Sequence, residues 1–179
     1  MRSEKQDDYQ IDATSRGNVL ITTISGTANH KSSLHAALYM ARQIKDNGLT
    51  WGMLKVMSPE GRATWVGRYQ TACDVSTILR KHMRGGILLV PDQYLAEAKF
   101  VATVSANFGL RMKAFSLTSE DEILAELVSG DGPLKRYLSA GIPSTGKDKK
   151  APPHCSTKQL VPTAGLILAP KDGDWLDTA

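Results

Sequence analysis

The residues best suited to chemistry lie in a short polar segment between an apolar run and a helical pattern. Ser58, Glu60 and Arg62 supply a hydroxyl, a carboxylate and a guanidinium there, and Gly61 allows close approach to the backbone. Backbone N–H groups at a helix start lack partners, and with the helix dipole they favour an anion. The sequence therefore predicts a partner- or anion-binding site in this segment. Its candidate residues are Ser58, Glu60, Gly61, Arg62, Thr64, Trp65 and Arg68.

The same segment also fits an ordinary helix start without any ligand. Ser58 can cap the helix, Pro59 suits its first position, and Glu60 suits the positive end of the helix dipole. Glycines weaken the first turns, so we expect the regular part of the helix to begin only at Thr64. The G-x-G-x-x-G and G-x-x-x-x-G-K-[ST] patterns are missing from the sequence, which leaves a conventional nucleotide-binding loop unsupported.

The remaining titratable residues do not form a pattern typical of an enzyme. The four histidines fall on separate predicted elements, and neither a Ser-His-Asp order nor a G-x-S-x-G motif is present. The acidic residues 120–122 stand at a predicted helix start, where carboxylates stabilise the helix. We therefore expect a non-enzymatic protein that uses no cofactor and no metal. The histidines are His30, His35, His82 and His154.

Composition favours one domain in a reducing compartment. The chain has 179 residues, of which 41% are hydrophobic, and a formal net charge of +4. Cys73 and Cys155 are far apart, so we interpret both as free thiols in the cytoplasm. The first ten residues lack the apolar region of a secretory signal, and the sequence has no apolar run of the roughly 18 residues that span a membrane.

A basic segment raises the question of nucleic-acid binding. Residues 80–84 contain three basic side chains at a predicted helix C-terminus, where cations are also favourable for structural reasons. Together with Arg111 and Lys113, they can form a surface patch for an acidic protein or RNA. Aromatic residues make up only 6% of the chain and do not alternate with the basic ones. We therefore do not expect nucleic acid as the partner.

Strands and helices alternate through residues 9–128, which predicts a mixed, mostly parallel β-sheet with an N-terminal hairpin and covering α-helices. The order is ββαβαβαβα, a short final turn near Leu138 follows, and a capping box at residues 119–122 starts the last helix. We expect residues 1–8 to be disordered, residues 9–142 to form the domain, and residues 143–179 to form a flexible tail. The expected strands are residues 9–14, 19–24, 51–57, 87–90 and 112–115, and the expected helices are residues 32–47, 58–79, 95–107 and 119–128.

Two stretches resemble the STAS domain of bacterial anti-sigma-factor antagonists and the related STAS/SEC14-like proteins. Residues 56–61, followed by residues 66–69, are similar to the strand, phosphorylation loop and second helix of that family. Residues 99–115, followed by the acidic helix, are similar to its closing part. The resemblance covers about residues 9–128 and implies a STAS-like α/β fold in a cytoplasmic regulatory protein of bacterial type.

The resemblance also implies a regulated loop, from which this sequence departs. The family's phosphorylated hydroxyl falls on Glu60, which cannot be phosphorylated, and the nearby hydroxyls are Ser58 and Thr64. The first functional hypothesis is therefore a regulatory or protein-interaction module that binds another protein, or a second copy of the chain, through the loop and helix start after the third strand. The alternative is a domain that binds a small anionic or lipid-like ligand at the same helix N-terminus.

Overall fold

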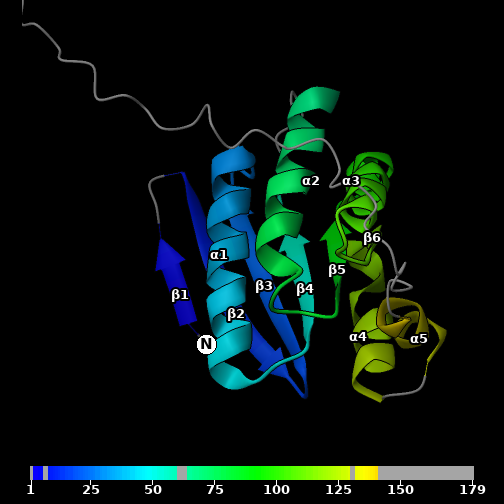
Figure 1. The fold of residues 1–179 in the computed structure, drawn as a ribbon. Coiled ribbons are helices and arrows are strands. Elements are labelled where there is room, and N and C mark those ends of the chain that lie inside the picture. The colour runs from blue at the N-terminus through cyan, green and yellow to red at the C-terminus, as the bar shows by residue number, and fades with distance from the viewer. Residues whose placement is uncertain (1, 6–7, 60–63, 130–131, 141–179) are drawn as a thin grey trace, which may run out of the picture.

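A six-stranded β-sheet forms the centre of the molecule (Figure 1), and a computed structural model describes it over residues 2–5, 8–59, 64–129 and 132–140. The strands lie in sequence order across the sheet, from β1 at one edge to β6 at the other. The strands are β1 (Arg2–Lys5), β2 (Tyr9–Arg16), β3 (Val19–Gly26), β4 (Trp51–Val56), β5 (Gly85–Val90) and β6 (Met112–Ser116). The helices are α1 (His30–Asn47), α2 (Trp65–Leu79), α3 (Leu95–Asn107), α4 (Glu120–Ser129) and α5 (Pro133–Ser139), with short 3-10 turns η1 (Asp92–Tyr94) and η2 (Leu117–Ser119).

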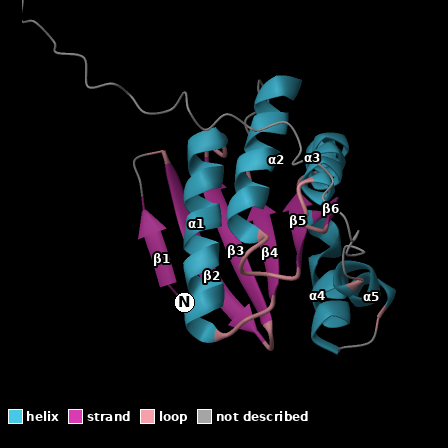
Figure 2. Cartoon of the chain, in the orientation of Figure 1, coloured by secondary structure: helices cyan, strands magenta, loops and turns pink. Residues whose placement is uncertain are grey.

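The sheet is mixed, as the alternation of elements predicts. β1 pairs with β2 and β2 with β3 in antiparallel fashion, whereas β3, β4, β5 and β6 pair in parallel. The parallel strands follow one another with a helix between each pair, so α1, α2 and α3 lie on the same face (Figure 2). The C-terminal ends of four strands therefore meet beneath the N-terminal ends of three helices.

The expectation of a disordered N-terminus is wrong for residues 2–5, which form the edge strand β1. This segment is short and polar, so it carries no apolar alternation that would signal a strand. Backbone pairing with β2 and side-chain hydrogen bonds hold it instead, among them a series that runs from Tyr9 through His35 to Glu4. Tyr9 Oη donates to His35 Nδ1 at 3.0 Å, and His35 Nε2 donates to Glu4 Oε2 at 2.7 Å. Burial raises the pKa of the Tyr9 phenol, and the nearby carboxylates of Asp8 and Glu4 raise it further.

Two hydrophobic clusters lie on opposite faces of the sheet. The larger one joins the sheet to α1, α2 and α3, and the smaller one joins alternate strand residues to α4 and α5. On the second face, the Lys55 ammonium of β4 pairs with the Glu120 carboxylate at 2.5 Å, which ties the first turn of α4 to the sheet. Neighbouring residues of a central strand therefore belong to different clusters, because successive strand side chains point to opposite faces.

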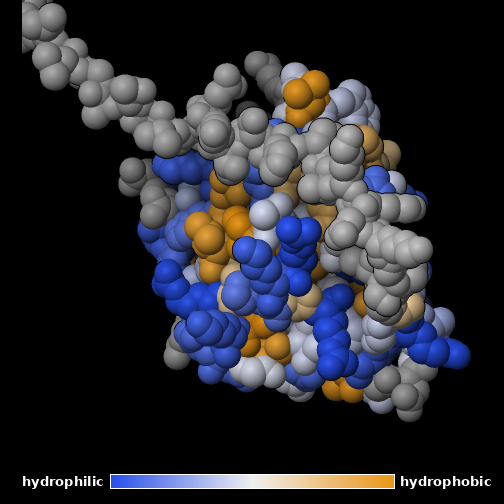
Figure 3. Space-filling view, viewed as in Figure 1, coloured by the Kyte–Doolittle hydropathy of each residue, from blue (hydrophilic) through white to orange (hydrophobic). Residues whose placement is uncertain are grey.

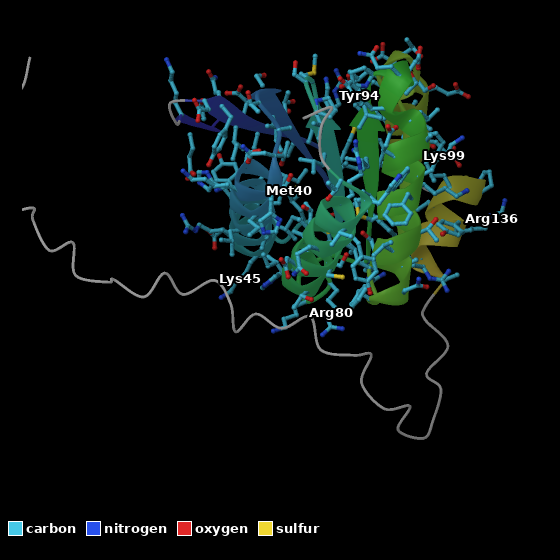
Figure 4. All side chains as sticks on the ribbon, turned by 90° about the horizontal axis from the view of Figure 1, so that it is seen from above. Met40, Lys45, Arg80, Tyr94, Lys99 and Arg136 are labelled. Carbon is cyan, nitrogen blue, oxygen red and sulfur yellow. The ribbon has the colours of Figure 1, made fainter. Side chains whose placement is uncertain are left out.

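α1 ends at Asn47, as the sequence indicates, but begins at His30, two residues before the expected start. Asn29 Oδ1 accepts from the Ser32 backbone N–H, the Asn29 N–H donates to Ser32 Oγ, and Gly48 closes the helix at a φ of 63°. Met40 of α1 points toward the sheet (Figure 4), and a methyl group added at Gly52 of β4 would lie 2.8 Å from its Cε atom. The glycine thus leaves room for Met40 of α1 and for Met83, whose Sδ atom would lie 2.7 Å from the added methyl group.

The fourth helix, α4, begins at Glu120, one residue after the expected start, but the hydroxyl cap lies elsewhere than predicted. Ser119 is the last residue of the 3-10 turn η2, and Ser116 is the residue whose hydroxyl accepts a backbone N–H, from Thr118 at 3.1 Å. The expected capping box over residues 119–122 therefore begins one turn too late. The predicted final turn is present as α5, in which Leu138 is buried. The proposed flexible tail, residues 143–179, lies outside the described residues.

Candidate functional site

The segment after β4 does not begin a helix at Ser58, contrary to the prediction. Ser58 is exposed and its carbonyl accepts the Ala28 N–H at 3.1 Å, while Pro59 forms a parallel bridge with Ala28. This pairing extends the sheet slightly beyond β3 and β4 and competes with a helical turn. Thr64 is the N-cap of α2, and its Oγ1 accepts the Gly67 N–H at 3.1 Å. The expectation that the regular part of the helix begins near Thr64 is therefore confirmed.

The structure brings together only some of the candidate site residues. Arg68 stacks on Trp65, with its guanidinium carbon 5.9 Å from the indole centroid, and Thr64 caps the same helical turn. Ser58 lies on the strand side of the loop, and residues 60–63, which include the candidates Glu60, Gly61 and Arg62, lie outside the described residues. The described part of the site thus centres on the first turns of α2.

A cavity of about 320 Å³ lies between the sheet and the helix layer, beneath these turns. Its inner walls are buried and apolar, and its partly exposed residues gather near the helix N-termini, so its opening is at that end. Parallel α/β sheets commonly bind ligands at this edge, at the carboxyl ends of their strands. The lining residues of the sheet and its loops are Ala28, Asn29, Leu54, Val56, Pro59, Leu88, Val90 and Met112, and those of the helices are His30, Ser33, Gly67, Arg68, Thr71, Ala72, Val75, Tyr94, Glu97, Ala98, Val101 and Ser105.

One pair of opposite charges stands at the opening of this cavity. Arg68 Nη2 lies 3.9 Å from Glu97 Oε1, which is an ion pair but too long for a hydrogen bond. The Arg68 side chain is mostly buried, because Trp65 covers it and itself packs edge-on against Phe100 at 5.0 Å. The opening therefore offers both hydrogen-bond donors and an acceptor to a polar group that enters between α2 and α3.

A second polar group joins α1 to α2 at the same opening. Thr71 Oγ1 donates to the Gly67 carbonyl at 2.9 Å and also shares a hydrogen bond of 2.9 Å with His30 Nδ1. His30 Nε2 then lies 3.6 Å from the carboxylate of Asp74. A hydroxyl committed to a carbonyl is a poor nucleophile, so we interpret this Thr-His-Asp arrangement as a structural link between the two helices.

The first turns of α2 also carry apolar side chains on the outside of the molecule. Trp65 exposes 59% of its surface, Val66 78% and Tyr69 42%. Figure 3 shows hydrophobic surface at the end of α2 where these residues lie. The exposed, partly apolar surface that the interaction hypothesis requires is therefore present around Trp65. Leu38 of α1 is also exposed, although its spacing from Leu34 and Ala41 is typical of one helix face.

Sequence reasoning missed the cavity residues that come from other elements. Glu97 belongs to α3 and His30 to α1, and only the parallel crossovers place them beside Arg68. The sequence spacing between these residues and α2 does not indicate that they are in contact. Only the order of strands and helices pointed to this location, because it places three helix N-termini at one edge of the sheet.

Other classes of site find no support within the described ranges. No group of three or more His, Cys, Asp or Glu residues there could hold a metal ion. Of the helices described, none combines the length and apolar character needed to cross a bilayer. Cys73 of α2 is buried and forms no disulfide with another described residue.

Comparison with known proteins does not add a family. No protein-family model matches the chain, and no curated protein gives a significant match to it. The resemblance to STAS domains therefore stays a prediction, and the functional argument depends on the geometry of the cavity and of α2.

Proposed function

We propose that this protein binds a small, largely apolar ligand in the cavity between its helix layer and its sheet. The observation that carries the proposal is the cavity of about 320 Å³ at the carboxyl ends of the strands, which is within the size range of small-molecule sites. Its walls between β4, β5, α2 and α3 are formed mainly by aliphatic side chains such as Leu54, Val75 and Val101. Burying an apolar body against them is the main source of affinity.

The ligand is amphipathic, with its outer polar group at the opening. Arg68 and Glu97 stand there with their charged atoms 3.9 Å apart, close enough to interact but not hydrogen-bonded to each other. A hydroxyl, amide or carboxyl group of the ligand can accept a hydrogen bond from the Arg68 guanidinium. This places the polar end of a lipid-like molecule beside the N-terminal turns of α2.

The cavity itself can be tested by filling it from α3. Ala98 lines the cavity and is buried, so Ala98→Leu places three extra carbon atoms in the space that the ligand occupies. The probe is decanol, titrated in a calorimeter. We expect wild type to bind decanol saturably. Ala98→Leu should bind it at least about tenfold more weakly, because the added side chain overlaps sterically with the ligand.

Ala96→Leu is the matched control, since it adds the same atoms to the exposed side of the same helix. It should bind decanol as wild type does. Equal decanol binding by Ala98→Leu and wild type, or no binding by wild type, would contradict the proposal.

The exposed surface of α2 favours a second candidate function, a regulatory or protein-interaction module. Trp65, Val66 and Tyr69 form an apolar patch on the first turns of α2, and aromatic side chains of this kind are frequent anchors in protein interfaces. The partner is another protein or a second copy of the chain. This function uses the outer side of the helix whose inner side lines the cavity, so the two proposals are compatible.

Val66→Asp tests the interaction surface without disturbing the fold. Val66 is 78% exposed in the first turn of α2, where a carboxylate suits the helix dipole. Loss of a central apolar contact should weaken a complex at least about tenfold. Analytical sedimentation would measure self-association. A different partner protein would first be isolated by co-purification, and its affinity for the chain would then be measured by titration. Leu38→Asp changes an apolar residue of α1 that is also exposed, at 55%, and should have no effect, so equal losses in both variants would argue against the patch.

A further inference from the structure

Ser105 of α3 is a hydroxyl residue without a partner at the inner part of the cavity. Its side chain is fully buried and lines the cavity, and its Oγ atom has no hydrogen-bond partner among the residues that the structure describes. Buried polar atoms are normally paired, because an unpaired one loses its bonds to water and gains nothing in exchange. The residue therefore calls for an explanation.

Other hydroxyl residues in the same helices satisfy themselves locally. Each donates to the carbonyl four residues earlier, as Ser76 does to Ala72 O within the buried part of α2. Ser105 does not make this bond, although it also lines the cavity. The other residues that follow the local pattern are Thr71, Thr77 and Thr103.

The position of Ser105 relative to the opening sets the length of the occupant. Glu97 and Ser105 lie eight residues apart on α3 and both line the cavity, so they are separated by about 12 Å along the helix axis. The sheet gives a similar length. Met112 is paired with Gly86 of β5, and Val90 lies four residues beyond Gly86, so Met112 and Val90 are about 13 Å apart along the strands. Met112 and Ser105 thus mark the inner end, and Glu97 and Val90 mark the outer end.

The inner end of the cavity favours an uncharged group. The charged or titratable side chains that line the cavity are His30, Arg68, Glu97 and Tyr94, and all four are at the partly exposed end. The buried lining residues, like Ser105 itself, include Ala72, Val75 and Met112, which cannot compensate an ion. Burying a charge there would be costly, whereas a neutral hydroxyl or carbonyl can bond Ser105 Oγ.

We propose, as an extension that rests on the proposed ligand-binding function, that the ligand is an elongated molecule with a polar group at each end. Its outer group binds at Arg68 and Glu97, its aliphatic middle contacts the walls, and an uncharged oxygen at its inner end hydrogen-bonds Ser105. Ser105 is then the residue that distinguishes such a molecule from a simple amphiphile with an apolar end.

Two alcohols of the same length test this assignment. Decanol and its α,ω-diol, decanediol, differ only in a hydroxyl at the far end of the chain. The quantity to compare is the ratio of the decanediol Kd to the decanol Kd. We expect Ser105→Ala to raise this ratio about tenfold above the wild-type value, because decanediol loses one buried hydrogen bond. The absolute affinity for decanol should stay unchanged or rise. Calorimetric titration of the full chain measures all four dissociation constants.

Thr103→Ala is the matched control, because it removes a hydroxyl from the exposed side of the same helix. It should leave the decanediol-to-decanol ratio at the wild-type value. Ser105→Cys, which keeps the size of the side chain but bonds weakly, should shift the ratio in the same direction as Ser105→Ala and serves if the alanine variant does not fold.

The possible failures can be told apart. A ratio unaffected by both Ser105 variants, with decanol still excluded by Ala98→Leu, would overturn the role of Ser105 and leave the proposed function intact. Absence of binding of both alcohols to wild type would overturn both proposals.

Discussion

Replacing Leu89 with alanine should lower the free energy of unfolding by about 4 kcal/mol, whereas the same change at Leu88 should cost only about 2 kcal/mol. The two residues are neighbours on β5 and point to opposite faces of the sheet. Leu89 is fully buried against α4 and α5, so its removal leaves a new void. Leu88 is 7% exposed and already borders the cavity, so fewer contacts disappear with its side chain.

Urea denaturation of both variants measures the difference, with an unchanged slope showing that the unfolding transition is comparable. The two variants should also separate in binding. Leu88→Ala enlarges the cavity and should alter the affinity for decanol, while Leu89→Ala, titrated well below its unfolding midpoint, should bind like wild type. Equal costs at the two positions would mean that Leu88 packs as tightly as Leu89 and that no open cavity lies beside it.

The alternation of strands and helices was predictable because it depends on local signals. Apolar strands of four to eight residues, helical spacing and strong stop signals such as Asn47-Gly48 act within one segment and need no partner. The strand β1 carries no such signal, since its stability comes from pairing with β2 and from the contact of Glu4 with His35. Long-range pairing of a polar edge strand cannot be recognised from its own residues.

Among the candidate site residues, the sequence singled out only ones near the start of α2. Arg68 and Trp65 lie together there because one helical turn connects them. The cavity beneath them depends on Glu97 and Ser105, which reach it through the crossover that brings α3 beside α2. Ser105 also has the sequence context of an ordinary helical serine, and only its burial and missing bond distinguish it.

Gly26, at the end of β3, holds the chain at the point where it turns toward the cavity, and Gly26→Ala should lower the free energy of unfolding by about 3 kcal/mol or more. Its φ is 86°, a conformation that alanine adopts with strain, and an added methyl group would lie 2.5 Å from the Asp8 carbonyl oxygen. That oxygen also accepts the Thr27 N–H at 3.0 Å, so it cannot move away without breaking the bond.

Gly48→Ala separates the two causes, because Gly48 has a φ of 63° but nothing lies within 4 Å of an added methyl group. It should cost only the conformational strain, about 1 kcal/mol. Thermal and urea unfolding of both variants give the comparison, and equal losses would show that crowding at Asp8 is relieved by a small shift. Gly26→Ala should also weaken decanol binding, since Ala28 and Asn29 line the cavity immediately after it. The correct turn at Gly26 is thus needed both to close the sheet against β2 and to place the α1 start at the opening of the cavity.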